Sequence, residues 1–221
     1  SPDLIVKSLD GDILSLKHLD EILDLSNNVD AVLIGPGAGI NGETAKLFNV
    51  LASKIKKPVV FDADALKQVE ISLVKSREDV IFTPHLSEFK RLFKVDGELK
   101  LDIDSYDFAK VDENITEFQK ITREINGCVI VKGQYDLILH KNNFRINKSG
   151  NPGMTVGGTG DALAGMCVSL LSQGLDSFDS AALAAFINGC AGDEAYKVSG
   201  NGFSASDLVS YIGSVIKDGL R

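Results

Sequence analysis

The residues best suited to chemistry lie in one glycine-rich stretch, Asn151 to Asp161, which precedes an apolar run of helical length. Gly157, Gly158 and Gly160 allow positive φ angles and a close approach of the backbone to a ligand. A loop that opens onto a helix offers unpaired N–H groups and a positive dipole end to a phosphate. Asp161 follows the last of these glycines, so a carboxylate that can act as a base would lie beside the phosphate. The alternative is a plain turn in which Asp161 only caps the helix.

Further polar residues follow the predicted buried strands. Asp62 and Asp64 come directly after the second strand, and His85 follows the third strand with Glu88 three residues later. Ligands of α/β proteins bind beyond the carboxyl ends of parallel strands, so we expect these side chains to line one site. The alternatives are ordinary turn caps for the two aspartates and a core histidine for His85. Lys132, which closes the fourth strand, is either an anion contact or a surface lysine.

Alternating strands and helices must position these residues. Short apolar runs are typical of parallel strands buried on both faces, whereas apolar residues three and four apart indicate helices. The apolar runs predict strands at residues 30–34, 58–61, 80–83 and 128–131, with a hairpin at 136–140 and 143–147. Helices are predicted at residues 16–25, 45–55, 89–93, 115–125, 162–173, 177–198 and 205–217. Residues 3–6 could form a further short strand, and residues 97–112 are expected to be a surface excursion.

The predicted fold class is therefore α/β, with a mostly parallel central sheet and helices on both of its faces. Residues 1–221 are expected to form a single domain, because no flexible linker or internal repeat interrupts them. A net charge of −8 without a basic stripe argues against nucleic acid and against an anionic membrane as partners. The three cysteines, far apart in apolar segments, indicate reduced thiols. We expect a cytoplasmic protein, because no leader-like start and no bilayer-length apolar run is seen.

Five short stretches, taken in order, form a motif series. They are Ile34-Gly35-Pro36-Gly37-Ala38-Gly39, Phe61-Asp62-Ala63-Asp64-Ala65-Leu66, Thr83-Pro84-His85-Leu86-Ser87-Glu88-Phe89, Val131-Lys132-Gly133 and the stretch from Asn151 to Asp161. This series resembles that of the ADP/ATP-dependent NAD(P)H-hydrate dehydratases, which belong to the ribokinase-like superfamily. The Asn-Pro-Gly-Met that precedes Gly-Gly-Thr-Gly-Asp is more specific than the Gly-Thr-Gly-Asp shared with sugar and vitamin kinases.

The resemblance implies a repair enzyme that phosphorylates the ring hydroxyl of hydrated NADH or NADPH, with ADP or ATP, and then eliminates phosphate. It implies that Asp161 is the general base and that Mg²⁺ assists, held through water by Asp64 or Glu88. Substrate binding would fall to Gly37, Asp64, His85, Asn151 and Asp161. Nucleotide binding would fall to Lys132, Gly133, Gln134, Tyr135, Asp136, Gly157, Gly158, Thr159 and Gly160.

The resemblance also sets expectations for assembly. Relatives usually begin with one further βα unit that touches the substrate, and we expect that N-terminal unit to be missing here, which would leave one sheet edge open. Relatives are often homo-oligomers, commonly tetramers. Where they carry a small residue and then Thr, this chain has Gln134-Tyr135-Asp136, so the choice between ADP and ATP stays open. Two other functions also stay open: a small-molecule kinase that releases a stable phosphorylated product, and a non-catalytic nucleotide-binding protein that needs a partner segment.

Overall fold

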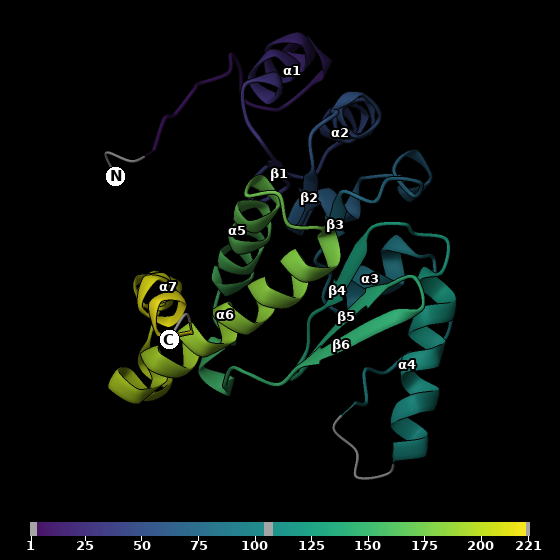
Figure 1. Ribbon diagram of the computed structural model, residues 1–221. Coiled ribbons are helices and arrows are strands. Elements are labelled where there is room, and N and C mark those ends of the chain that lie inside the picture. Colours follow the sequence, from purple (N-terminus) through teal and green to yellow (C-terminus); the bar gives the residue numbers. More distant parts are fainter. Residues whose placement is uncertain (1–3, 104–107, 220–221) are drawn as a thin grey trace.

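The computed structural model describes residues 4–103 and 108–219 (Figure 1). Its strands are β1 (Val32–Ile34), β2 (Val59–Phe61), β3 (Val80–Phe82), β4 (Cys128–Val131), β5 (Asp136–His140) and β6 (Asn143–Asn147). Its α-helices are α1 (Leu19–Asn27), α2 (Gly42–Lys54), α3 (Leu86–Leu92), α4 (Phe108–Thr122), α5 (Thr159–Ser172), α6 (Ser177–Ser199) and α7 (Ala205–Gly219). The four predicted parallel strands are confirmed, which follows from their uninterrupted apolar runs, and the hairpin predicted from alternating residues is confirmed as β5 and β6.

The described strands form one sheet in the order β1-β2-β3-β4-β5-β6. Neighbours from β1 to β4 are parallel, and the hairpin of β5 and β6 continues the sheet antiparallel to β4. Val32, Val59 and Val80 are in register, so β1, β2 and β3 also end level with one another. The loops that follow the parallel strands therefore meet at one edge of the sheet, where the predicted site residues lie.

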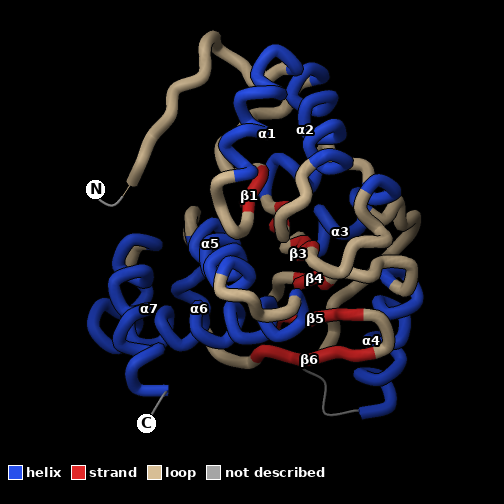
Figure 2. The backbone as a smooth tube through the Cα atoms, turned by 45° about the horizontal axis from the view of Figure 1, so that its top comes forward, coloured by secondary structure: helices blue, strands red, loops and turns tan. Residues whose placement is uncertain are grey.

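Successive strand residues point to opposite faces of the sheet, and each face carries its own core. Val59 and Phe61 pack in one cluster with apolar residues of α2, α3 and α4, such as Phe48. Val60 packs in the other cluster with residues of α5 and α6, such as Cys167. Figures 1 and 2 show α5 and α6 on the side of the sheet opposite α3 and α4. The predicted mostly parallel sheet with helices on both faces is confirmed.

The structure differs from the sequence-based expectations in three places. Residues 4–6 form no strand, and their apolar side chains are exposed. The expected helix at 16–25 begins with a turn of 3-10 helix, Leu16–His18, before α1. The expected surface excursion at 97–112 is wrong in part: Leu99 and Ile103 are buried in the core, and α4 begins at Phe108. Residues 104–107 of that stretch lie outside the described residues.

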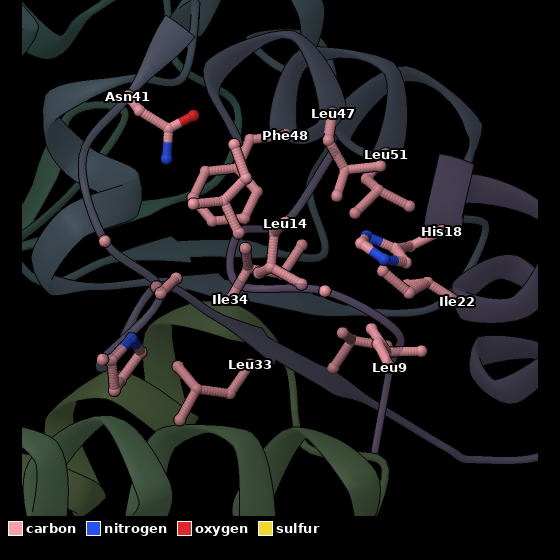
Figure 3. A pocket seen from close by; sticks show the side chains of 18 of the residues that line it. Leu9, Leu14, His18, Ile22, Leu33, Ile34, Asn41, Leu47, Phe48 and Leu51 are labelled. Carbon is pink, nitrogen blue, oxygen red and sulfur yellow. The ribbon is translucent and has the colours of Figure 1, made fainter. Parts of the chain in front are cut away.

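Strand β1 is an edge of the sheet in the described part of the chain, and a hollow of about 670 Å³ runs along it. Apolar side chains from β1, α1, α2 and residues 9–14 converge on this hollow (Figure 3). Of the predicted site residues only Gly37 lines it, so the hollow belongs to the sheet edge rather than to the phosphate loop.

Two further properties are the length and polarity of the helices and the state of the cysteines. Among the helices of residues 4–103 and 108–219, none is long and apolar enough to cross a membrane. Cys128, Cys167 and Cys190 are free, as expected. Burial raises the pKa of the Cys128 and Cys167 thiols, so these two sulfurs are poor nucleophiles.

Candidate active site

The glycine-rich stretch forms the predicted loop and helix start. Gly158 is the N-cap of α5 and has a φ of +98°. Residues other than glycine rarely adopt this left-handed backbone conformation. The Thr159 hydroxyl lies 2.8 Å from the carbonyl oxygen of Met154 and 3.0 Å from that of Val156, which closes the loop on itself. Asp161 is exposed in the first turn of α5. The structure thus places a free carboxylate at a helix end whose amides face the loop.

A second helix fixes the beginning of this loop. The Asp193 carboxylate on α6 accepts the Gly150 N–H at 3.1 Å and the Asn151 amide at 2.9 Å. The other side-chain atom of Asn151, its Oδ1, accepts the Gly153 N–H at 3.0 Å. Asn151, predicted as a substrate contact, therefore shapes the loop with both ends of its side chain. The sequence gives no signal for Asp193, because it lies in a long helix of small residues 42 positions away from Asn151.

The ends of three neighbouring strands share one buried network. Asp62, at the end of β2, accepts the Thr83 hydroxyl at 2.7 Å and the Lys132 ammonium at 3.1 Å, both on Oδ1. Thr83 follows β3 and Lys132 follows β4, so each parallel strand contributes one member. The Asp62 side chain is only 2% exposed, whereas that of Lys132 is 21% exposed. The lysine therefore links a buried carboxylate to the surface of the site.

Lys132 also brings the sheet and the glycine loop together. Its Nζ lies 3.4 Å from the point where a Cβ on Gly160 would stand, in the first turn of α5. Its backbone N–H donates to the Pro84 carbonyl at 2.8 Å, and the backbones of Lys132 and His85 form an isolated parallel bridge. Three residues predicted from separate stretches, His85, Lys132 and Gly160, are thus neighbours in space.

The loop after β1 lies against the residues that follow β2. A Cβ on Gly35 would stand only 1.8 Å from the Asp62 carbonyl oxygen, so no other residue fits at that contact. The Gly39 N–H donates to Asp64 Oδ2 at 3.0 Å, and the Lys67 ammonium lies 3.3 Å from Asp64 Oδ1. Gly37 is exposed at the tip of this loop. The loop that carries the predicted substrate residue Gly37 is therefore tied through Gly39 to the predicted substrate residue Asp64.

His85 caps α3 together with Glu88. The Glu88 N–H donates to His85 Nδ1 at 3.3 Å, and Glu88 Oε2 accepts the His85 N–H at 3.1 Å. Glu88 Oε2 also lies 3.4 Å from His85 Nε2, and its side chain is 8% exposed against 53% for His85. The buried carboxylate thus fixes the orientation of an imidazole that is open to solvent, which suits a ligand contact better than a core position.

The residues proposed to hold a metal do not form a ligand cluster. In the described residues, no three side chains of His, Cys, Asp or Glu lie close enough together to hold a metal ion. Asp64 and Glu88 already accept backbone N–H groups at their carboxylates. Magnesium usually keeps several waters and takes one or two carboxylates plus substrate phosphates. Asp64 and Glu88 would therefore reach a Mg²⁺ ion through water, with substrate phosphates as its other ligands.

The turn between β4 and β5 and the ends of these two strands carry the remaining residues that are predicted to bind the nucleotide. Asp136 accepts the Gly133 N–H at 3.3 Å and the Asn147 amide at 3.1 Å, so it fixes the turn that also holds Gln134. Burial raises the pKa of the Asp136 carboxyl, and the Asn147 and Gly133 hydrogen bonds oppose that shift. The Lys148 ammonium lies 5.2 Å from the centre of the Tyr135 ring.

This fold and these strand ends define a ribokinase-like α/β protein. A ribokinase-like superfamily protein from Enterococcus faecalis superposes with a TM-score of 0.71, covering 91% of this chain and 68% of its own, at 22% identity. The ADP/ATP-dependent NAD(P)H-hydrate dehydratase of Bacillus subtilis, co-crystallised with ATP/Mg²⁺ and soaked with CoA, superposes with a TM-score of 0.67. That match covers 89% of this chain and 71% of the other at 21% identity. Both likenesses concern the fold.

The family follows from sequence comparison. The family model for NAD(P)H-hydrate dehydratase matches residues 1–214. The bifunctional NAD(P)H-hydrate repair enzyme Nnr of Methanothermobacter thermautotrophicus is 46% identical over 223 residues, which cover 100% of this chain and 41% of the relative. The chain belongs to the NAD(P)H-hydrate dehydratase family, and the resemblance seen in its motifs is confirmed. It spans less than half the length of that curated relative.

Proposed function

We propose that this chain catalyses the ADP- or ATP-dependent dehydration of hydrated NADH or NADPH. The observation that carries the proposal is the meeting of three features in one place: the amide end of α5, the Lys132 ammonium beside Gly160, and the exposed Asp161 carboxylate. Phosphoryl transfer needs positioned positive charge around the phosphate and a base for the attacking hydroxyl, and these features supply both. Membership in the dehydratase family selects the substrate class.

The proposed reaction has two stages. Asp161 removes the proton of the ring hydroxyl, whose oxygen attacks the terminal phosphorus of ADP, and the bond from that phosphorus to AMP breaks. The phosphate group then leaves as inorganic phosphate with the electrons of its C–O bond, and the adjacent ring carbon gives up a proton to solvent water, so that its C–H electrons form the ring double bond. The ring double bond is thereby restored. Lys132 and the amides of Gly157, Gly158 and Gly160 stabilise charge on the transferring phosphoryl group.

The other predicted residues surround these reacting groups in the proposal. Gly37, Asp64 and His85 bind the hydrated nicotinamide nucleotide from the ends of β1, β2 and β3. The residues of the β4–β5 turn bind the adenine nucleotide, and Thr159 and Asn151 keep the phosphate loop in shape. Asp64 or Glu88 would hold a nucleotide-bound Mg²⁺ through water, and the ion would supply positive charge that screens the phosphate oxygens.

The test is turnover of hydrated NADH with ADP or ATP and Mg²⁺, followed by the return of nicotinamide absorbance. Asp161→Asn should lower kcat by about 10²–10⁴-fold, the usual effect of a lost general base, while calorimetry shows unchanged ADP affinity. Asp179→Asn is the matched control, because Asp179 is an exposed aspartate in the first turn of α6. Near-normal turnover by Asp161→Asn would remove this residue from the mechanism.

Two outcomes would replace the proposed function with another. Accumulation of a stable phosphorylated product would indicate a small-molecule kinase. Binding of ADP without turnover of any substrate would indicate a nucleotide-binding protein that needs a partner segment. The direct comparison of ADP with ATP, and of hydrated NADH with hydrated NADPH, determines the two preferences.

We also propose that residues 1–221 act as a single domain in a cytoplasmic homo-oligomer. The free thiols suit a reducing compartment. Phe186 and Leu183 on α6 are 54% and 39% exposed, and large exposed apolar side chains that lie together favour contact with another chain. Light scattering of the purified protein measures the oligomeric state, and cell fractionation tests the compartment.

A further inference from the structure

The buried network at the strand ends places a cation next to the start of a helix. The Lys132 ammonium lies beside the first turn of α5, and the start of a helix carries positive partial charge. A cation is favourable at the C-terminal end of a helix. An ammonium at the N-terminal end therefore costs free energy unless negative charge lies nearby. The Asp62 carboxylate supplies part of that negative charge, because its Oδ1 lies 3.1 Å from the Lys132 Nζ. Asp161, exposed in the same first turn of α5, adds a second carboxylate, and a phosphate bound there would meet both the ammonium and the helix start.

The position of Asp62 is also costly by itself. Its side chain is 2% exposed, and a buried carboxylate is tolerated only when paired and hydrogen-bonded. Apolar residues in place of a buried ion pair often give an equally stable protein, so stability alone does not explain the pair. Lysine has a flexible four-carbon stem, and its ammonium keeps one position only when a partner holds it. Asp62 is that partner, and the Thr83 hydroxyl fixes the carboxylate in turn at 2.7 Å.

We propose that Asp62 is a positioning residue that holds the Lys132 ammonium against the first turn of α5, aimed at the phosphoryl group that is transferred. This inference rests on the proposed dehydratase function. It makes a distinctive prediction, because the charge of Asp62 opposes an anionic nucleotide while its hydrogen bond fixes the lysine. Asp62 is therefore expected to raise kcat, by keeping the ammonium in place, without improving the affinity for the nucleotide.

The experiment compares single and double variants in steady-state kinetics with hydrated NADH, ADP and Mg²⁺. Asp62→Asn should lower kcat by about 10–100-fold without raising the KM for ADP, since positioned charge acts mainly in the transition state. Lys132→Met should lower kcat and raise that KM by about 10-fold or more, because the charge itself is lost. Since Asp62 acts through Lys132, the double variant should be no slower than Lys132→Met alone.

The matched control is an ion pair at the opposite ends of the same strands. Asp79 precedes β3 and pairs with Arg77, which also donates to the carbonyls of Ile55 and Lys57 ahead of β2. Asp79→Asn should change the urea midpoint but neither kcat nor KM. If Asp62→Asn fails to fold, Thr83→Val removes the hydroxyl that fixes Asp62, and a fall in kcat of about 2–10-fold at unchanged KM is expected.

Several results would overturn the proposal. One is a KM for ADP that rises as far in Asp62→Asn as in Lys132→Met. Another is a fall in the kcat of Asp62→Asn that is no larger than that of Asp79→Asn. The third is a double variant whose loss of kcat equals the product of the two single losses. If the wild-type protein shows no turnover, the proposed function fails by itself. Calorimetry with ADP then tests the positioning role of Asp62. This role is supported if Asp62→Asn binds ADP as tightly as the wild type or more tightly while Lys132→Met loses ADP binding, and any other pattern refutes it.

Discussion

The left-handed turn at Gly158 allows a stability prediction with a worked magnitude. Alanine at this position would keep a φ of +98°, at a cost of about 1–2 kcal/mol for a residue other than glycine. Its Cβ would stand 2.9 Å from the Cβ of Ala205, and such an overlap in a packed region adds about 1–3 kcal/mol. The reduced freedom of the unfolded chain returns about 0.4–1 kcal/mol. The expected loss of unfolding free energy therefore lies between about 1 and about 4.6 kcal/mol, with the middle of that range at about 3 kcal/mol.

Urea denaturation, followed by far-ultraviolet circular dichroism, measures this loss. With a slope of about 2–3 kcal/mol per molar urea, the midpoint of Gly158→Ala should fall by about 1 M. Gly157→Ala is the matched control, because a Cβ there meets nothing within 4 Å and its φ is not positive, so its midpoint should stay almost unchanged. Adding Ala205→Gly to Gly158→Ala should recover the part of the loss that comes from the overlap.

The strain argument has two clear ways to fail. A wild-type midpoint for Gly158→Ala would show that the loop adapts and that its left-handed conformation is not required. An equal loss in Gly157→Ala would show that any side chain in the loop is harmful, whatever its φ. Full recovery by Ala205→Gly would assign the whole effect to the overlap and none to the backbone.

The remaining predictions concern caps and anchors. Asn41→Ala removes the acceptor of two N–H groups at the start of α2 and should destabilise the protein by about 1 kcal/mol in urea unfolding. Asp193→Ala breaks the bonds to Gly150 and Asn151; it should cost about 1–3 kcal/mol and also lower kcat/KM, whereas unchanged turnover would show that this anchor does not serve the site. The backbone N–H and the hydroxyl of Ser204 donate to the Asp207 carboxylate and hold its pKa below the ordinary value of 3.8. The ionised carboxylate therefore stabilises the folded protein above that pH, and this contribution is lost as the pH falls below it. Asp207→Asn should thus lower the Tm at pH 7, with a difference that narrows as the pH falls below 3.8.

The sheet and the edge that carries the site could be predicted because both depend on local signals. The run Val59 to Phe61 is buried on both faces, and polar residues follow it at once. The capping box that starts α7, Ser204 with Asp207, likewise involves only four consecutive residues. Patterns of this kind involve neighbours along the chain, so a single sequence contains them.

Contacts between distant residues could not be predicted in the same way. Asp62 and Lys132 are 70 positions apart, and nothing near either residue indicates that they pair. The anchor from Asp193 to Asn151 depends on how α6 crosses the loop, which only packing decides. The burial of Leu99 and Ile103 was missed for a related reason: their acidic surroundings hide two side chains that reach the core.

The separation of Asp62 from Lys132 also has a consequence for the order of folding. Pairing of β2 with β3 brings Thr83 to the carboxylate, but its cationic partner arrives only when β4 pairs with β3. Until then the end of β2 must stay hydrated, because an unpaired buried charge is too costly. Such long-range closure is slow, so we expect the phosphate site to be among the last parts of the chain to become ordered. Pulsed hydrogen exchange during refolding would test this: amides after β2 should gain protection together with β4, and earlier protection would contradict the expected order.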